Sequence, residues 1–321
     1  MPSASSRFIL GENAQTPSYR DSELRLGYLT DMIFINDGFG LSLDKVTMAR
    51  IPNSRKIDPD IEARITSQWK AETDKNPNAH DAPRARFEGS MFDTNTGRLL
   101  VNWSEEKYST HNSVRNLNVG KAYQANLWTI NAILLPGDKK LPIGLRNPET
   151  TDQGPIKHLT PVGFVDIVKK PVYGKGGTVV SEMYGVESIA DAVSRRLHDE
   201  WDVPEGAFDQ SKMKLMGIVY NSHKNFDYDA AILVPLDCYS EQLKSKQLRS
   251  ANPKGKYDAV ELVDMSKSSL SSLLYEFALS PDKSSGHMRG DMALTIGALH
   301  GGEEAYLDAL ENTLLRLAKL R

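Results

Sequence analysis

The 321-residue sequence predicts an α/β fold, and three features of it point to this class. Residues 127–135 are apolar at nearly every position, as expected of a strand covered on both faces. Between residues 187 and 203, apolar side chains recur at Ile189, Val193 and Leu197, the spacing of an amphipathic helix. After residue 120 the predicted order is strand, strand, helix, strands and closing helices. We therefore expect the helix at 187–203 to pack on a mixed sheet that contains the strand at 127–135.

The first third of the chain predicts a smaller α+β extension. Asp58-Pro59 opens a helix, because Asp is a favoured N-cap and Pro is favoured at the first helical position. Residues 86–92 and 99–103 are expected strands on either side of an Asp- and Gly-containing turn. We place the domain boundary after residue 120, with the extension at 1–120 and the larger domain at 121–321.

The bulk composition narrows the compartment and the partners. The formal net charge of −3 offers no electrostatic case for nucleic acid or an acidic membrane as a partner. The single cysteine excludes an intramolecular disulfide, and no Cys/His cluster has zinc spacing. No targeting segment or membrane-length apolar run is visible. We expect a soluble, cytoplasmic protein.

Two charges lie on the wrong side of the helix predicted at 187–203. At 100° per residue, Glu200 projects close to Ile189 and Val193, and Arg196 lies on the other edge of the same apolar stripe. A carboxylate turned toward a core is costly unless it is paired or coordinates a metal. This helix is therefore the main candidate for a functional element.

The same stretch resembles the Nudix box, G-x5-E-x7-R-E-U-x-E-E-x-G-U, where U is a bulky aliphatic residue. The matching positions are Glu187 for the first Glu, Arg195 for the Arg, Leu197 and Val203 for the aliphatic residues, and Asp199-Glu200 for the Glu pair. Pro161-Val-Gly163 is similar to the strand that precedes the motif loop in this family. The departures are Ser181 and Asp202 at the Gly positions, Asp199 at a Glu position, and Arg196 at the Glu that usually binds magnesium.

The resemblance implies a Nudix-type α/β/α sandwich and a magnesium-dependent hydrolase, with Mn²⁺ as an alternative metal. Its substrate would be a nucleoside diphosphate linked to another group. A UDP-sugar is the best specific guess, because Trp69, residues 84–87 and residues 108–115 look similar to the extension of Nudix proteins that hydrolyse UDP-sugars. The implied metal ligands are Asp199 and Glu200, with Glu187 more distant. Glu200 and Arg195 would be catalytic, with Arg195 orienting Glu200. Substrate phosphates would be faced by Arg146, Arg196, Gly163 and Lys175.

Two other interpretations remain open. A catalytically silent Nudix fold would bind a nucleotide or a protein partner, and the positive charge of Arg196 at a ligand position favours it. In a different α/β domain the same stretch would be an ordinary surface helix with an Arg196–Glu200 ion pair. The sequence is also compatible with a homodimer.

Overall fold

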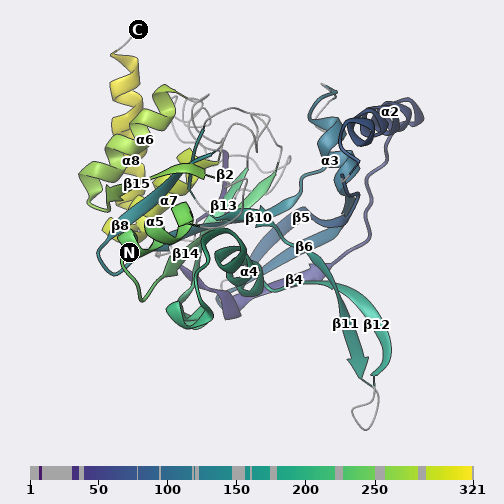
Figure 1. Ribbon diagram of the computed structural model, residues 1–321, viewed down its shortest axis with the longest axis horizontal. Helices are drawn as coiled ribbons and strands as arrows, with labels where there is room; N and C mark the ends of the chain where they lie inside the picture. Colours follow the sequence, from purple (N-terminus) through teal and green to yellow (C-terminus); the bar gives the residue numbers. More distant parts are fainter. Residues whose placement is uncertain are drawn as a thin grey trace.

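The computed structural model has a mixed α/β fold, which confirms the predicted class (Figure 1). It describes residues 7–8, 31–35, 40–77, 79–93, 95–117, 119, 123–146, 156–159, 161–173, 179–220, 227–249, 257–280 and 287–319. None of the helices within these ranges is long and apolar enough to cross a membrane.

The main sheet is mixed and has seven strands. Its order is β1 (Arg7–Phe8), β2 (Asp31–Ile35), β13 (Lys214–Tyr220), β14 (Tyr228–Pro235), β7 (Trp128–Leu135) and β10 (Val162–Phe164), with β3 (Leu41–Ser42) also paired to β13. Only β14 and β7 run parallel among these pairs, and the others are antiparallel. The predicted strand at 127–135 is thus β7, which lies between β14 and the edge strand β10 and contributes side chains to buried cores on both faces of the sheet.

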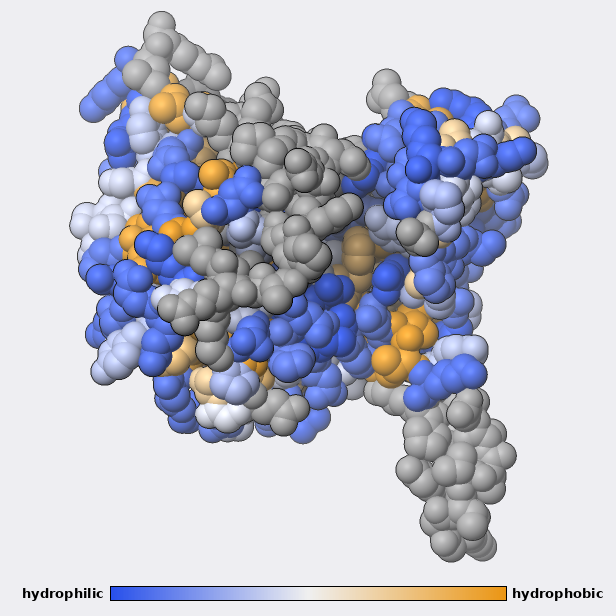
Figure 2. Space-filling model, in the orientation of Figure 1, coloured by the Kyte–Doolittle hydropathy of each residue, from blue (hydrophilic) through white to orange (hydrophobic). Residues whose placement is uncertain are grey.

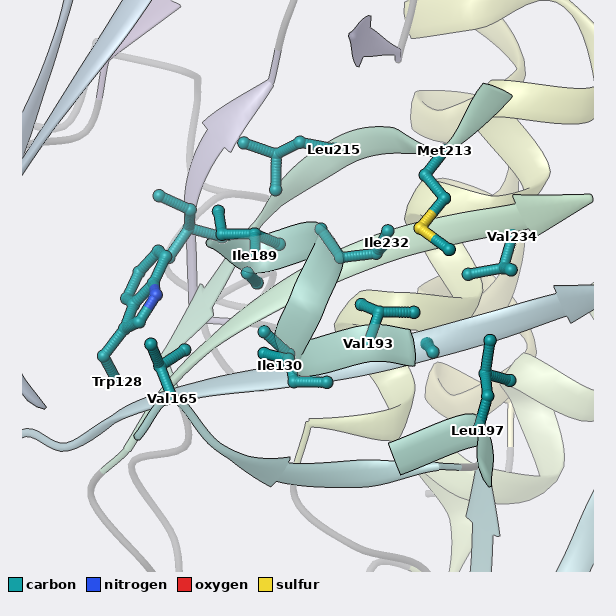
Figure 3. Packing of buried hydrophobic residues seen from close by; sticks show 14 of the residues in the cluster. Trp128, Ile130, Val165, Ile189, Val193, Leu197, Met213, Leu215, Ile232 and Val234 are labelled. Carbon is teal, nitrogen blue, oxygen red and sulfur yellow. The ribbon is translucent and has the colours of Figure 1, made fainter. Parts of the chain in front are cut away.

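Helix α4 (Ile189–Trp201) lies on one face of this sheet. Its N-cap Ser188 accepts a hydrogen bond from the Asp191 amide at 3.0 Å, and the left-handed Asp202 (φ 49°) ends it. The fully buried side of α4 points its apolar residues at the strands beneath (Figure 3). The labelled residues in that contact are Ile189, Val193 and Leu197 on the helix, and Trp128, Ile130, Val165, Met213, Leu215, Ile232 and Val234 below and around it. The helix predicted for 187–203, and its packing on the β7 sheet, are confirmed.

The opposite face is covered by a second group of helices. These are α6 (Lys267–Leu279), α7 (Met288–His300) and α8 (Gly302–Ala318). Strand alternation separates the two cores: Ile130 and Ala132 belong to the α4 side, whereas Ile133 belongs to the side of α7. Gly290 lets α7 approach closely, because a Cβ there would lie 2.7 Å from a methyl group of Val219 on β13.

The predicted extension contributes to two sheets. Strands β4 (Val46–Arg50), β6 (Arg98–Lys107) and β5 (Pro83–Asp93) form a separate three-stranded sheet, with α2 (Pro59–Lys75) and α3 (Tyr108–Val114) nearby. Phe87 of β5 stacks on Trp128 at 4.9 Å and on Tyr228 at 4.4 Å, so this sheet shares the core beneath α4. Strands β1, β2 and β3 instead join the main sheet. The division at residue 120 stays a prediction. Strands from the N-terminal side of it pair within the main sheet and share its core.

The remaining elements lie around the main sheet. Strands β15 (Tyr257–Asp264), β8 (Lys140–Arg146) and β9 (Lys157–Leu159) form a small antiparallel sheet, and α5 (Ser240–Arg249) contacts it. Strands β11 (Ile167–Tyr173) and β12 (Val179–Val186) pair only with each other among the described strands. Figure 1 shows this two-stranded ribbon projecting from the body of the molecule.

Candidate functional site

Arg195 on α4 holds Glu187, the residue that precedes the N-cap. Its guanidinium donates to both carboxylate oxygens of Glu187, at 3.2 Å for the Nε–Oε2 bond. It also reaches the carbonyl of Phe164 at 3.3 Å and the carboxylate of Asp166 at 3.0 Å. The Asp166 amide donates to Glu187 Oε1 at 2.7 Å. The expected Arg195–Glu200 contact is therefore wrong: Arg195 orients Glu187, because its side chain runs toward the β10 end and away from the last turn of α4.

The Arg195 network continues into the extension. Arg84 on β5 pairs with Asp166, and its guanidinium carbon lies 5.4 Å from the ring centre of Phe164. Arg84 and Asp166 also form an isolated backbone bridge. The Glu187, Arg195, Asp166 and Arg84 charges thus fasten β5 to the start of α4. This contact gives the Glu–Arg pair of the motif a structural role.

Arg196 and Glu200 form the second charge pair of α4. Arg196 Nη1 lies 3.7 Å from Glu200 Oε1, and the two side chains are 23% and 8% exposed. The Arg196 side chain crosses β10 at Gly163, where a Cβ would collide with Nε, Cζ and Cδ of the arginine. Gly163 is therefore required for Arg196 to lie where it does. These two predicted substrate-binding residues are brought together by the fold.

The carboxylates assigned to magnesium do not converge. Glu187 is buried and bonded to Arg195 and the Asp166 amide, whereas Asp199 is exposed on the outer side of α4. Within the described ranges, no three or more His, Cys, Asp or Glu side chains form a group that could hold a metal ion. Glu187 is thus engaged by Arg195, whereas Asp199 and Glu200 are adjacent on the last turn of α4.

The other two predicted phosphate contacts lie elsewhere. Arg146 ends β8, and its amide donates to the Ile156 carbonyl at 2.9 Å. Its positive charge acts on His287 at the N-cap of α7, so it belongs to the neighbourhood of α7. Lys175 lies outside the described residues.

A buried polar cluster between α7 and the main sheet was not predicted. It consists of Thr129 and Asn131 on β7, Asp229 on β14, and His287 and Asp291 at the start of α7, and we call it the α7 seam. Thr129 Oγ1 donates to Asp229, and Asn131 Nδ2 donates to Asp291. His287 Nδ1 lies 3.6 Å from Asp229 Oδ2. A signal was present in the sequence, since Thr129 and Asn131 are the polar exceptions in the apolar strand and share one of its faces.

Burial shifts the protonation of the seam toward neutral forms. It raises the pKa of Asp291 well above the ordinary value, and the negative charge of Asp229 raises it further. Burial also raises the pKa of Asp229 and lowers that of His287, where the positive charge of Arg146 acts in the same direction as burial.

A second buried acid–imidazole pair lies beside the seam. His111 Nδ1 of α3 is 3.4 Å from Asp227 Oδ1, just before β14. Burial, followed by the charge of Arg115, lowers the pKa of His111 to about 3. Burial and the charge of Asp229 raise the pKa of Asp227 well above its ordinary value. Perturbed groups gather at functional sites more often than elsewhere, which makes this region a second candidate.

Comparisons with known proteins give no family for this chain. No family model matches it, and no curated protein matches it. One similar solved structure is DR0079 from Deinococcus radiodurans, with a TM-score of 0.32 and 12% sequence identity, covering 52% of this chain and 80% of that one. At this level of similarity the match assigns neither fold family nor function.

Proposed function

We propose that this protein binds a nucleotide-linked, phosphate-bearing small molecule at the edge formed by α4 and β10, without hydrolysing it through the α4 carboxylates. One observation carries the proposal. Each end of the Nudix-like motif pairs its carboxylate with an arginine of α4: Glu187 with Arg195, and Glu200 with Arg196. The ligand class comes from the sequence resemblance.

Arg196 is the group best placed to bind a phosphate. Its Nε is buried against Gly163 without a hydrogen-bond partner, while the side chain stays 23% exposed. The 3.7 Å separation from Glu200 is longer than a hydrogen bond, so the terminal N–H groups keep donor capacity. A guanidinium held in this way offers charge-assisted, bidentate bonds to phosphate oxygens. The surface over α4, near the centre of Figure 2, is hydrophilic, as a phosphate site requires.

A magnesium-dependent hydrolase of a UDP-sugar is the second candidate function. Asp199 is exposed and adjacent to Glu200 on the last turn of α4. The long Arg196–Glu200 contact is one that a divalent cation can compete with, since hard carboxylate oxygens are preferred Mg²⁺ ligands. In this case Asp199 and Glu200 would hold the metal when it is bound, and the metal would polarise the phosphate.

Isothermal titration with UDP-glucose, with and without Mg²⁺, separates the two functions. The variants are Arg196→Glu and Glu200→Gln, with Arg98→Glu as a control at an exposed arginine of β6. If the protein is a binder, the wild-type chain should bind UDP-glucose in the presence of a metal chelator. Arg196→Glu should then weaken binding by at least about tenfold, because one charge-assisted contact contributes about 1.5–3 kcal/mol. Arg98→Glu should leave the affinity unchanged.

The hydrolase gives the opposite pattern. Arg196→Glu would restore a motif carboxylate, tighten Mg²⁺ binding and raise the rate of UMP release, whereas Glu200→Gln would abolish that release. If no protein binds either ligand, both functions are excluded. A protein partner would then be the remaining class.

A further inference from the structure

The side chains of the α7 seam are almost completely buried. The exposed fractions are 0% for Asn131 and Asp291, 2% for Asp229 and 3% for His287. His287 and Asp291 are four residues apart, so they lie on the same side of α7, the side that faces β7 and β14. Polar groups thus replace apolar contacts along one stripe of an otherwise apolar helix–sheet interface.

Docking α7 through buried polar groups costs free energy compared with docking through apolar side chains. Asn131 Oδ1 and Asp291 Oδ1 are fully buried and accept no hydrogen bond. Leaving a buried acceptor unsatisfied costs roughly 1–3 kcal/mol, and apolar side chains of similar size avoid that cost. The interface is therefore weaker along the seam than in the apolar contacts beside it.

Several titratable and charged groups surround the seam. The titratable and charged groups next to its members are Asp227, just before β14, with His111 of α3 and Arg115 beside it, His158 from β9, and Arg146 from β8; Arg289 of α7 is also buried. Strand β7 contributes only the uncharged Thr129 and Asn131. The ring of His158 lies 5.0 Å from that of His287. Because Asp229 acts on both Asp227 and Asp291, loss of protons from these carboxyl groups places like charges side by side.

We propose that the α7 seam is a proton-operated latch: α7 stays docked on the sheet while the carboxyl groups of the seam keep their protons, and it opens as they lose them. The latch is independent of the ligand proposed for α4, which lies on the other face of the sheet.

The direction of the pH dependence follows from the two kinds of group. A carboxyl group whose pKa is raised in the docked state stabilises docking at low pH, and this contribution disappears as pH rises through the raised pKa. The opening equilibrium constant should therefore rise by up to about tenfold per pH unit for each such carboxyl group. His287 acts in the opposite direction, since its docked form is neutral, but only below its ordinary value of 6.5. Above pH 6.5 His287 contributes no slope, and below it the comparison of wild type with Asp291→Asn separates the carboxyl contribution from that of His287.

Hydrogen exchange of the full chain between pH 5 and 9 tests the latch, with rates corrected for intrinsic exchange. We expect the amides of α7, residues 288–300, to lose protection as pH rises, while those of α4, residues 189–201, keep theirs. The central variant is Asp291→Asn, which keeps the size and hydrogen-bonding shape of the side chain but has no proton to lose. It should flatten the pH dependence in α7. The matched control is Asp308→Asn on α8, a 52% exposed carboxylate, which should behave as wild type.

Three outcomes overturn the latch. The first is corrected protection of wild-type α7 that does not change with pH. The second is an equal loss of protection in α4 and α7, because that indicates global unfolding. The third is an Asp291→Asn variant that keeps the full wild-type slope. If Asp291→Asn does not fold, Asp229→Asn and the comparison of α7 with α4 in wild type decide the question.

Discussion

The two faces of the main sheet handle buried charge in different ways. Under α4, the carboxylates of Glu187 and Glu200 each meet an arginine whose side chain is 30% or 23% exposed. Under α7, the carboxyl groups of Asp229 and Asp291 are bonded to a hydroxyl and an amide. Ion pairs are retained where water can still reach the cation, whereas the enclosed seam favours neutral forms.

This contrast suits the two faces to different tasks: binding an anionic ligand at α4 and responding to pH at α7. A partly exposed arginine offers a fixed positive charge to an anionic ligand at any physiological pH. An enclosed carboxyl group changes its charge with pH and carries that change into the packing of a helix.

The largest effect is expected from His111, which should lower the stability of the fold as the pH falls. Its pKa of about 3 in the fold, against an ordinary value of 6.5, means that the folded chain excludes a proton which the unfolded chain accepts. His111 by itself should therefore remove about 1.4 kcal/mol of stability for each pH unit below 6.5. Urea unfolding between pH 7 and 4.5 should show a steeper acid loss in wild type than in His111→Asn. Parallel curves would exclude a neutral, enclosed His111.

The next effect is the removal of Glu187. Glu187→Ala leaves the Asp166 amide without its acceptor and leaves Arg195 with Asp166 and the Phe164 carbonyl. We expect a loss of about 2–3 kcal/mol in the free energy of unfolding. This is below the roughly 3–5 kcal/mol of a fully buried pair, because Arg195 is 30% exposed. Asp199→Ala, at an exposed position of the same helix, should change stability by less than about 0.5 kcal/mol. Equal effects would show that the Glu187–Arg195 pair is not structural.

A smaller effect is expected where α7 touches the sheet. Gly290→Ala puts a Cβ 2.7 Å from Val219 and should destabilise the fold by about 1–2 kcal/mol through overpacking. It should also raise hydrogen exchange in α7 at every pH, without changing the slope with pH. Gly206→Ala, whose Cβ would meet nothing within 4 Å, is the control. A stabilised Gly290→Ala protein would contradict the close approach of α7.

The smallest effect is expected from Glu200→Gln. Its contact with Arg196 is 3.7 Å long and the arginine is partly exposed, so we expect a change of no more than about 0.5–1 kcal/mol in chemical denaturation. A loss as large as that of Glu187→Ala would mean that the two ends of α4 are anchored alike.

The helix and the central strand could be predicted because their periodicity is local. Ile189, Val193 and Leu197 share one side of a helix whatever the rest of the chain does, and the apolar run of β7 requires cover on both faces. The assignment of β2 to the main sheet could not be predicted, since it depends on pairing with β13, roughly 180 residues later in the chain.

The partners of the site residues were equally non-local. Spacing placed Arg195 on the correct side of α4, but its bonds to Asp166 and Phe164 depend on where β10 ends. The contact of Gly163 with Arg196 likewise needs a strand and a helix from separate segments. The α7 seam joins residues 160 positions apart, such as Asn131 and Asp291. The only sequence signal for it was the pair of polar residues in the otherwise apolar strand β7.

We propose that arginines, and not a metal, pair with the carboxylates of Glu187 and Glu200 at the two ends of α4. Titration of the full chain with UDP-glucose in excess chelator, then in Mg²⁺, tests this most directly, with product analysis of the same samples. We expect equal affinity in both conditions and intact UDP-glucose at the end. Binding that requires Mg²⁺, together with release of UMP, would contradict the claim and establish the hydrolase instead.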